Sequence, residues 1–92
     1  MPDRRTPDQA LLRRIAEGDR AALREFRLRY GTTAYAIAYS VLVDPETAEA
    51  AVSEAFTAAW QEAGGRLPRA MGAAAWISQL TREAAGRLLR SA

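Results

Sequence analysis

The side chains of this sequence that could do chemistry are arginines in its last third and carboxylates in its middle third. The first set is Arg66, Arg69, Arg82, Arg87 and Arg90, with Trp76 among them. Arginines hold phosphate groups and aromatic rings stack on bases, so such a set is typical of sites for single-stranded nucleic acid. Trp76 also continues the apolar stripe of a helix, and the pattern favours a core position for it over an exposed one.

The carboxylates lie along one expected helix, residues 45–62. Asp44 can accept hydrogen bonds from the first free N–H groups of that helix, and Pro45 suits its first position. One helix face is apolar, whereas the opposite, outer face is acidic with small residues between the charges. The outer face consists of Glu46, Glu49, Ala50, Ser53, Glu54, Thr57 and Gln61. It is either an ordinary solvated face, which the pattern alone favours, or a surface that another molecule approaches closely.

The residue types that usually drive catalysis and bind metals are missing. The sequence contains no histidine and no cysteine, and every basic residue is an arginine. The serines therefore have no histidine or lysine to activate them, and the usual zinc ligand sets cannot form. Gly64-Gly65 is not followed by the Lys-Ser/Thr pair of a phosphate-binding loop. We expect a protein that is not an enzyme, with no catalytic residue, no metal site and no cofactor.

Hydropathy and charge bear on the compartment and on the partners. No apolar run is long enough to cross a bilayer and no secretory signal is visible, so we expect a cytoplasmic protein without membrane contact. The net charge is +3 over residues 1–30, −4 over 31–60 and +3 over 61–92. This order suggests two kinds of partner surface. We attribute the exclusive use of arginine, beside abundant alanine, first to a GC-rich genome.

Apolar periodicity predicts an all-α fold and no strand. The expected helices are 7–17, 20–43, 45–62 and 73–90. Residues 64–72 hold three glycines and a proline and are expected to form a loop. We therefore predict a disordered N-terminus at 1–6 and a single helical domain at 7–92. Its architecture would be a compact bundle of three main helices plus a short N-terminal helix.

Local signals place the ends of the first two helices. Thr6 is the expected cap of the first helix, with Pro7 at its first position and Gln9 closing a capping box. Gly18 is the expected stop, because glycine tolerates the left-handed conformation, and Asp19 then caps the second helix. We expect one long second helix, disturbed near its interior glycine, with its arginines at 20, 24, 27 and 29 outside.

The order of several motifs is the most specific signal in the chain. The motifs are LLRRIAEGDRAALREF at 11–26, RYG at 29–31, AY at 34–35, DPETAE at 44–49, EAF at 54–56 with Trp60, AWI at 75–77 with Leu80, and RLLR at 87–90. In this order and spacing the chain resembles region 2 of the group 4, or extracytoplasmic-function, bacterial sigma factors. The resemblance covers residues 8–90, which is nearly the whole chain.

The resemblance implies a function in transcription initiation. Region 2 of these factors binds the clamp of the RNA polymerase β′ subunit, and it recognises and melts the −10 promoter element by capturing a base of the non-template strand. The polymerase-binding positions would be Glu46, Glu49, Ala50, Ser53, Glu54 and Thr57. The DNA-binding positions would be Arg66, Arg69, Gln79, Arg82, Glu83, Arg87 and Arg90. The implied partners are core polymerase, promoter DNA and an anti-sigma factor.

Three of the positions that depart from the pattern of the family bear on the implied contacts. Ala50 stands where these factors usually carry Asp, and Ser53 stands where they carry Gln, both within the polymerase contact. Glu83 puts a negative charge where a DNA-facing amide is usual. The alternative is therefore a divergent stand-alone module that binds proteins and lacks initiation activity. The family also carries a second helical domain, region 4, and the sequence leaves open whether this chain belongs to a longer factor.

Overall fold

Four helices form the part of the chain that the computed structural model describes, residues 6–63 and 71–91. They are α1 (Asp8–Ala16), α2 (Arg20–Leu42), α3 (Pro45–Ala63) and α4 (Ala73–Ser91). No strand occurs within these residues. The predicted all-α bundle of three long helices and a short N-terminal one is confirmed, and each boundary lies within one residue of its prediction.

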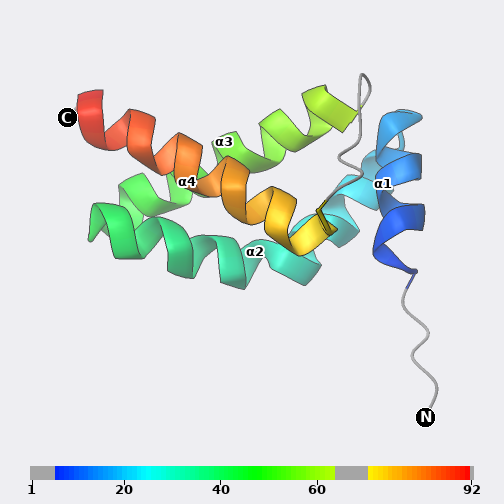
Figure 1. The fold of residues 1–92 in the computed structure, drawn as a ribbon, viewed down its shortest axis with the longest axis horizontal. Helices are drawn as coiled ribbons and strands as arrows, with labels where there is room; N and C mark the ends of the chain where they lie inside the picture. The colour runs from blue at the N-terminus through cyan, green and yellow to red at the C-terminus, as the bar shows by residue number, and fades with distance from the viewer. Residues whose placement is uncertain (1–5, 64–70, 92) are drawn as a thin grey trace, which may run out of the picture.

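The three long helices pack on one another, and α1 lies against the N-terminal end of α2 (Figure 1). Phe26 of α2 is fully buried where they meet. Its ring centroid lies 5.6 Å from that of Phe56 on α3 and 6.4 Å from that of Trp76 on α4. Aromatic pairs at such distances stabilise beyond the area they bury. This cluster fixes which faces of α3 and α4 point inward and therefore which faces remain outside.

The caps that the sequence predicts for α2 and α3 are present. Gly18 has a φ of 89°, the left-handed conformation that ends α1. The carboxylate of Asp19 then accepts hydrogen bonds from the N–H groups of Ala21 and Ala22, at 2.9 and 3.3 Å. Asp44 does the same for α3, accepting from the N–H of Thr47 at 2.9 Å. Each cap joins residues that are neighbours in the sequence, so the local sequence pattern was sufficient to predict where α2 and α3 begin.

The predicted cap of α1 is wrong. Pro7, and not Thr6, occupies the capping position, and no side chain caps this end. The carbonyl oxygen of Thr6 instead accepts a hydrogen bond of 2.6 Å from the guanidinium of Arg29 on α2. A long-range contact has therefore taken the place of the local capping box.

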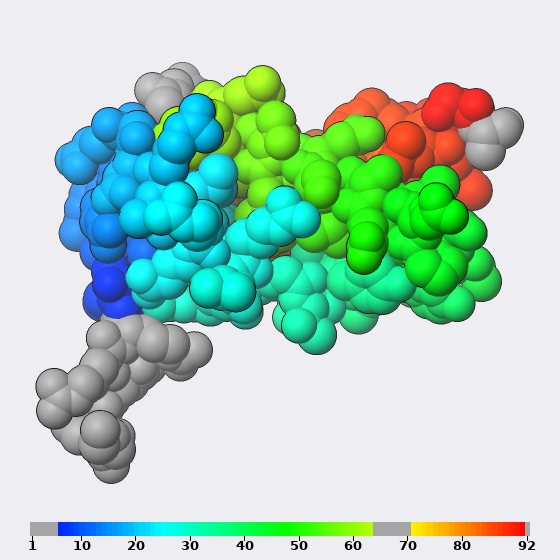
Figure 2. Space-filling view, turned by 180° about the vertical axis from the view of Figure 1, so that it is seen from behind, coloured from blue at the N-terminus to red at the C-terminus, as the bar shows by residue number. Residues whose placement is uncertain are grey.

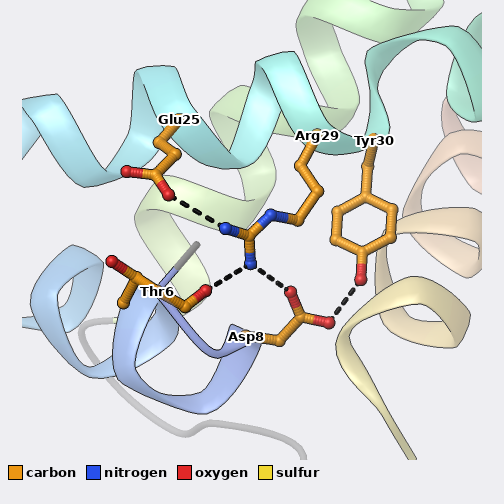
Figure 3. Close-up of polar contacts among 5 residues, drawn as sticks. All are labelled: Thr6, Asp8, Glu25, Arg29 and Tyr30. Carbon is orange, nitrogen blue, oxygen red and sulfur yellow. Dashed lines mark hydrogen bonds and ion pairs between the residues drawn. The ribbon is translucent and has the colours of Figure 1, made fainter. Parts of the chain in front are cut away.

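The periodicity predicted Arg29 on the outside of α2, and this prediction is also wrong. The Arg29 side chain is only 10% exposed, because α1 lies across this turn of α2. It donates to the carboxylates of Asp8 and Glu25 at 2.8 and 2.9 Å, and the hydroxyl of Tyr30 also donates to Asp8 (Figure 3). This network attaches α1 to α2, since it joins residues more than 20 positions apart.

Two positions of α2 show how packing overrides local preference. The helix runs unbroken through Gly31, where we predicted a disturbance. Buried Phe26 and Ala34 on either side hold the helix in place, and their packing outweighs the roughly 1 kcal/mol that an interior glycine costs. At the end of α2, Val43 has a φ of 53°, a left-handed conformation that is strained for a β-branched residue.

Candidate functional site

The outer face of α3 is the first candidate surface, and the structure brings its predicted residues together. The apolar side of the helix is buried through Ala48, Ala51, Val52, Ala55, Phe56 and Ala59. The six predicted polymerase-binding positions are all exposed: Glu46, Glu49, Ala50, Ser53, Glu54 and Thr57. We name these six positions the α3 outer face. Their common exposure follows from the cluster around Phe26, which holds the opposite side of α3 inward.

The start of this face is fixed by its cap. The N–H and then the hydroxyl of Thr47 donate to the carboxylate of Asp44, and these hydrogen bonds lower the pKa of Asp44 from its ordinary value of 3.8. Asp44 is therefore negatively charged near neutral pH, at the positive end of the helix dipole. Glu46 in the same first turn adds to that favourable interaction.

A groove of about 610 Å³ runs between the α3 outer face and α2. We name it the α2–α3 groove. Its lining consists of Arg24, Arg27, Leu28, Gly31, Thr32, Tyr35, Glu49, Val52 and Ser53. Figure 2 shows this side of the molecule, with α2 in cyan to teal beside α3 in green. The groove has arginines on its α2 wall and a glutamate on its α3 wall, so it carries both signs of charge.

Seven of the nine groove residues were not predicted as site residues, and three of these seven are exposed side chains that are charged or large and apolar. Arg24 and Arg27 were interpreted only as exposed arginines, and Leu28, which is 85% exposed, was not assigned to any surface. One signal for them exists in the sequence, because Leu28 is a large apolar residue that stands between two arginines outside the buried stripe. The sequence pattern does not show that these side chains border α3.

Arg27 closes one part of the groove wall. Its guanidinium donates to the hydroxyl of Ser53 at 3.2 Å and lies 5.7 Å from the ring centroid of Phe56. A predicted polymerase-binding position, Ser53, is therefore already hydrogen-bonded within the chain. A partner that uses Ser53 has to share or displace this contact.

The outward face of α4 is the second candidate surface. The predicted DNA-binding residues within it are Gln79, Arg82, Glu83, Arg87 and Arg90, and all five are exposed. The amide of Gln79 donates to the carboxylate of Glu83 at 3.3 Å, so one oxygen of this negatively charged group already accepts a hydrogen bond within the helix. The remaining two predicted residues, Arg66 and Arg69, lie outside the described residues. Trp76 is 5% exposed and belongs to the core, as the sequence pattern favoured.

The two candidate surfaces meet at one contact. Arg87 of α4 lies 3.5 Å from the carboxylate of Glu54 on α3, atom to atom. A predicted DNA-binding residue is thus paired with a predicted polymerase-binding residue. Both side chains stay about half exposed, at 54% and 44%, so each can still reach a partner.

Within residues 6–63 and 71–91, no three His, Cys, Asp or Glu side chains cluster as metal ligands would. None of the described helices is long and apolar enough to pass through a bilayer. Comparisons with protein-family models, curated proteins and solved structures found no match.

Proposed function

We propose that the chain is a sigma region 2-like domain that binds the β′ clamp of core RNA polymerase. The observation that carries the proposal is the exposure of all six positions of the α3 outer face on one well-capped helix. Three of the six are glutamates at 46, 49 and 54, separated by small side chains. Such a face lets a basic partner helix approach closely, because short side chains leave room between the charges.

The same proposal assigns the face of α4 to the −10 promoter element. Arg82 and Arg90 would hold phosphates of the non-template strand, and Gln79 would meet the edge of a base. Glu83 repels phosphate, so this face should bind more weakly than one with an amide there. The predicted loop residues Arg66 and Arg69 would add to the same interface. The domain would have no catalytic role of its own.

Binding to core polymerase tests the first part. We expect Glu54→Ala to weaken binding about tenfold, because a charge-assisted hydrogen bond typically contributes about 1.5–3 kcal/mol. Glu17→Ala, an exposed glutamate at the end of α1, is the matched control and should leave binding unchanged. If the native chain does not bind core polymerase at micromolar concentrations, the polymerase proposal is wrong.

Binding to single-stranded −10 oligonucleotides tests the second part. Arg82→Ala should weaken binding. It should also reduce the slope of log affinity against log salt concentration by about one, which is the contribution of one phosphate contact. Glu83→Gln should strengthen it, because the substitution removes a charge that repels phosphate. The DNA proposal fails if neither substitution changes oligonucleotide binding.

One observation favours a second function, a protein-binding module without initiation activity. Ser53 is held by Arg27, and Ala50 offers no polar atom, so two of the six positions of the α3 outer face have little to give a polymerase. The partner would then be an anti-sigma factor or the chain itself. The double substitution Ala50→Asp with Ser53→Gln separates the two functions. If it creates polymerase binding that the native chain lacks, the module has diverged.

A further inference from the structure

The α2–α3 groove carries one charge of each sign that forms no ion pair with any of the residues that the structure describes. Arg24 on one wall and Glu49 on the other are both exposed, and neither forms an ion pair with any residue among 6–63 and 71–91. Leu28 lies in the same lining and is 85% exposed. A single exposed leucine is ordinary. Leu28 lies in the same lining as these two charges, so a partner that pairs with the charges would also cover Leu28.

The occupant that these charges fit is a second copy of this chain. We propose that the α2–α3 groove is the contact of a symmetric dimer in which Arg24 of each copy pairs with Glu49 of the other. A two-fold axis that lies along the protein surface at the mouth of the groove, midway between these two side chains and perpendicular to the line joining them, places each opposite its counterpart on the second copy. Leu28 follows Arg24 by one helical turn, so it lies on the same side of α2 and packs within this contact.

Neighbouring charges strengthen the complementarity. Arg27 adds a second arginine to the α2 wall of the groove. Beyond the groove lining, Arg20, whose guanidinium lies 5.3 Å from the Trp60 ring centroid, continues the basic side along α2, and Glu46 continues the acidic side one turn before Glu49 on α3. Each copy therefore presents one basic and one acidic patch, and the two-fold arrangement satisfies both at once. A nucleic acid would be repelled by the acidic wall. A partner of a single charge sign would likewise be repelled by one of the two walls.

The dimer has a consequence for the proposed function. It covers Glu49 and Ser53, which belong to the α3 outer face, so self-association and polymerase binding would exclude each other. This consequence rests on the proposed function, but the dimer itself does not. A chain that dimerises and does not bind polymerase would refute the proposed function and leave the dimer intact.

Sedimentation velocity of the full chain over concentrations from about 1 to about 500 µM tests the dimer. We expect the native chain to pass from monomer to dimer across this range. Arg24→Glu or Glu49→Arg alone should weaken self-association about tenfold or more, because like charges then face each other. The double variant, and an equimolar mixture of the two single variants, should regain the dimer, because opposite charges meet again.

Matched controls separate this contact from general charge and apolar effects. Arg82→Glu and Glu83→Arg on α4 lie outside the groove and should leave the dimer unchanged. Leu28→Asp should abolish it, whereas Leu89→Asp, at a residue 53% exposed outside the groove lining, should not. Circular dichroism confirms that each variant is folded. A native chain that stays monomeric throughout, or a charge-swapped double variant that stays monomeric, overturns the proposal.

Discussion

Arg87 on α4 and Glu54 on α3 form an ion pair, with the guanidinium nitrogen Nη2 3.5 Å from the carboxylate oxygen Oε1. The pair joins the face proposed to bind DNA to the face proposed to bind polymerase. Because both side chains are about half exposed, water and salt screen their attraction, and we expect less than about 1 kcal/mol of stability from it. The pair matters for binding, because Arg87 and the proposed polymerase partner would compete for Glu54.

The first prediction concerns Arg87→Ala. Removing Arg87 frees Glu54, so polymerase binding should strengthen by about twofold to fivefold while binding to single-stranded −10 DNA weakens. Urea denaturation should show a change in unfolding free energy below about 1 kcal/mol. The two binding measurements are the test, since a merely structural role for Arg87 would weaken both together.

The second prediction concerns Arg29→Met. The guanidinium of Arg29 links the Thr6 carbonyl and two carboxylates, and its side chain is 10% exposed. Asp8 and Glu25 are 32% and 40% exposed, so water can solvate them when Arg29 is lost. We therefore expect a loss of about 2–3 kcal/mol in the free energy of unfolding, below the range for a fully buried pair.

Urea denaturation measures this loss, and Arg13→Met is the control, because Arg13 is an exposed arginine on α1 outside the network. Hydrogen exchange should show faster opening of α1 than of α4 in the Arg29 variant. Equal destabilisation by both substitutions would mean that the network around Arg29 does not hold α1 in place.

The third prediction concerns Val43→Gly. Val43 has a φ of 53° and is 69% exposed, so its side chain contributes little packing and is strained by the left-handed backbone. Glycine takes this conformation freely, and we expect a gain of about 1 kcal/mol in the free energy of unfolding. Val41→Gly, inside α2, is the matched control and should lose about 1 kcal/mol or more. Thermal unfolding of the two variants should therefore shift in opposite directions.

The fourth prediction concerns pH and Asp44. The hydrogen bonds from Thr47 lower the pKa of Asp44 below its ordinary value of 3.8 in the folded chain. A lowered pKa stabilises the fold at pH values above the ordinary value, and this stabilisation is lost as the pH falls through the folded pKa. Asp44→Asn keeps a capping oxygen but no titrating group.

The native chain should therefore exceed Asp44→Asn in stability at neutral pH, and the difference should shrink as the pH falls below 3.8. Denaturant unfolding at a series of pH values measures the difference. Glu46→Gln removes a neighbouring charge without removing the cap and serves as the control. A difference that stays constant with pH would show that Asp44 does not stabilise the helix through its charge.

Local patterns in the sequence were sufficient for the helices and for one candidate surface. Asp19, Asp44 and Gly18 act on backbone groups within a few residues of themselves, so their types and spacing determined where helices begin and end. The α3 outer face followed in the same way. Its residues recur with the helical period opposite an apolar stripe, and the aromatic cluster of the core then held that stripe inward.

The positions of Arg29 and of the α2–α3 groove were decided by the tertiary structure alone. Arg29 looks like any exposed arginine of α2 until α1 lies across it, and the partner that buries it, Asp8, is 21 residues away. The groove likewise depends on how α2 and α3 pack side by side, which places Leu28 and Arg24 near Glu49. Periodicity within one helix describes which face is apolar. It does not determine which residues of another helix cover or border that face, because that depends on contacts between distant segments.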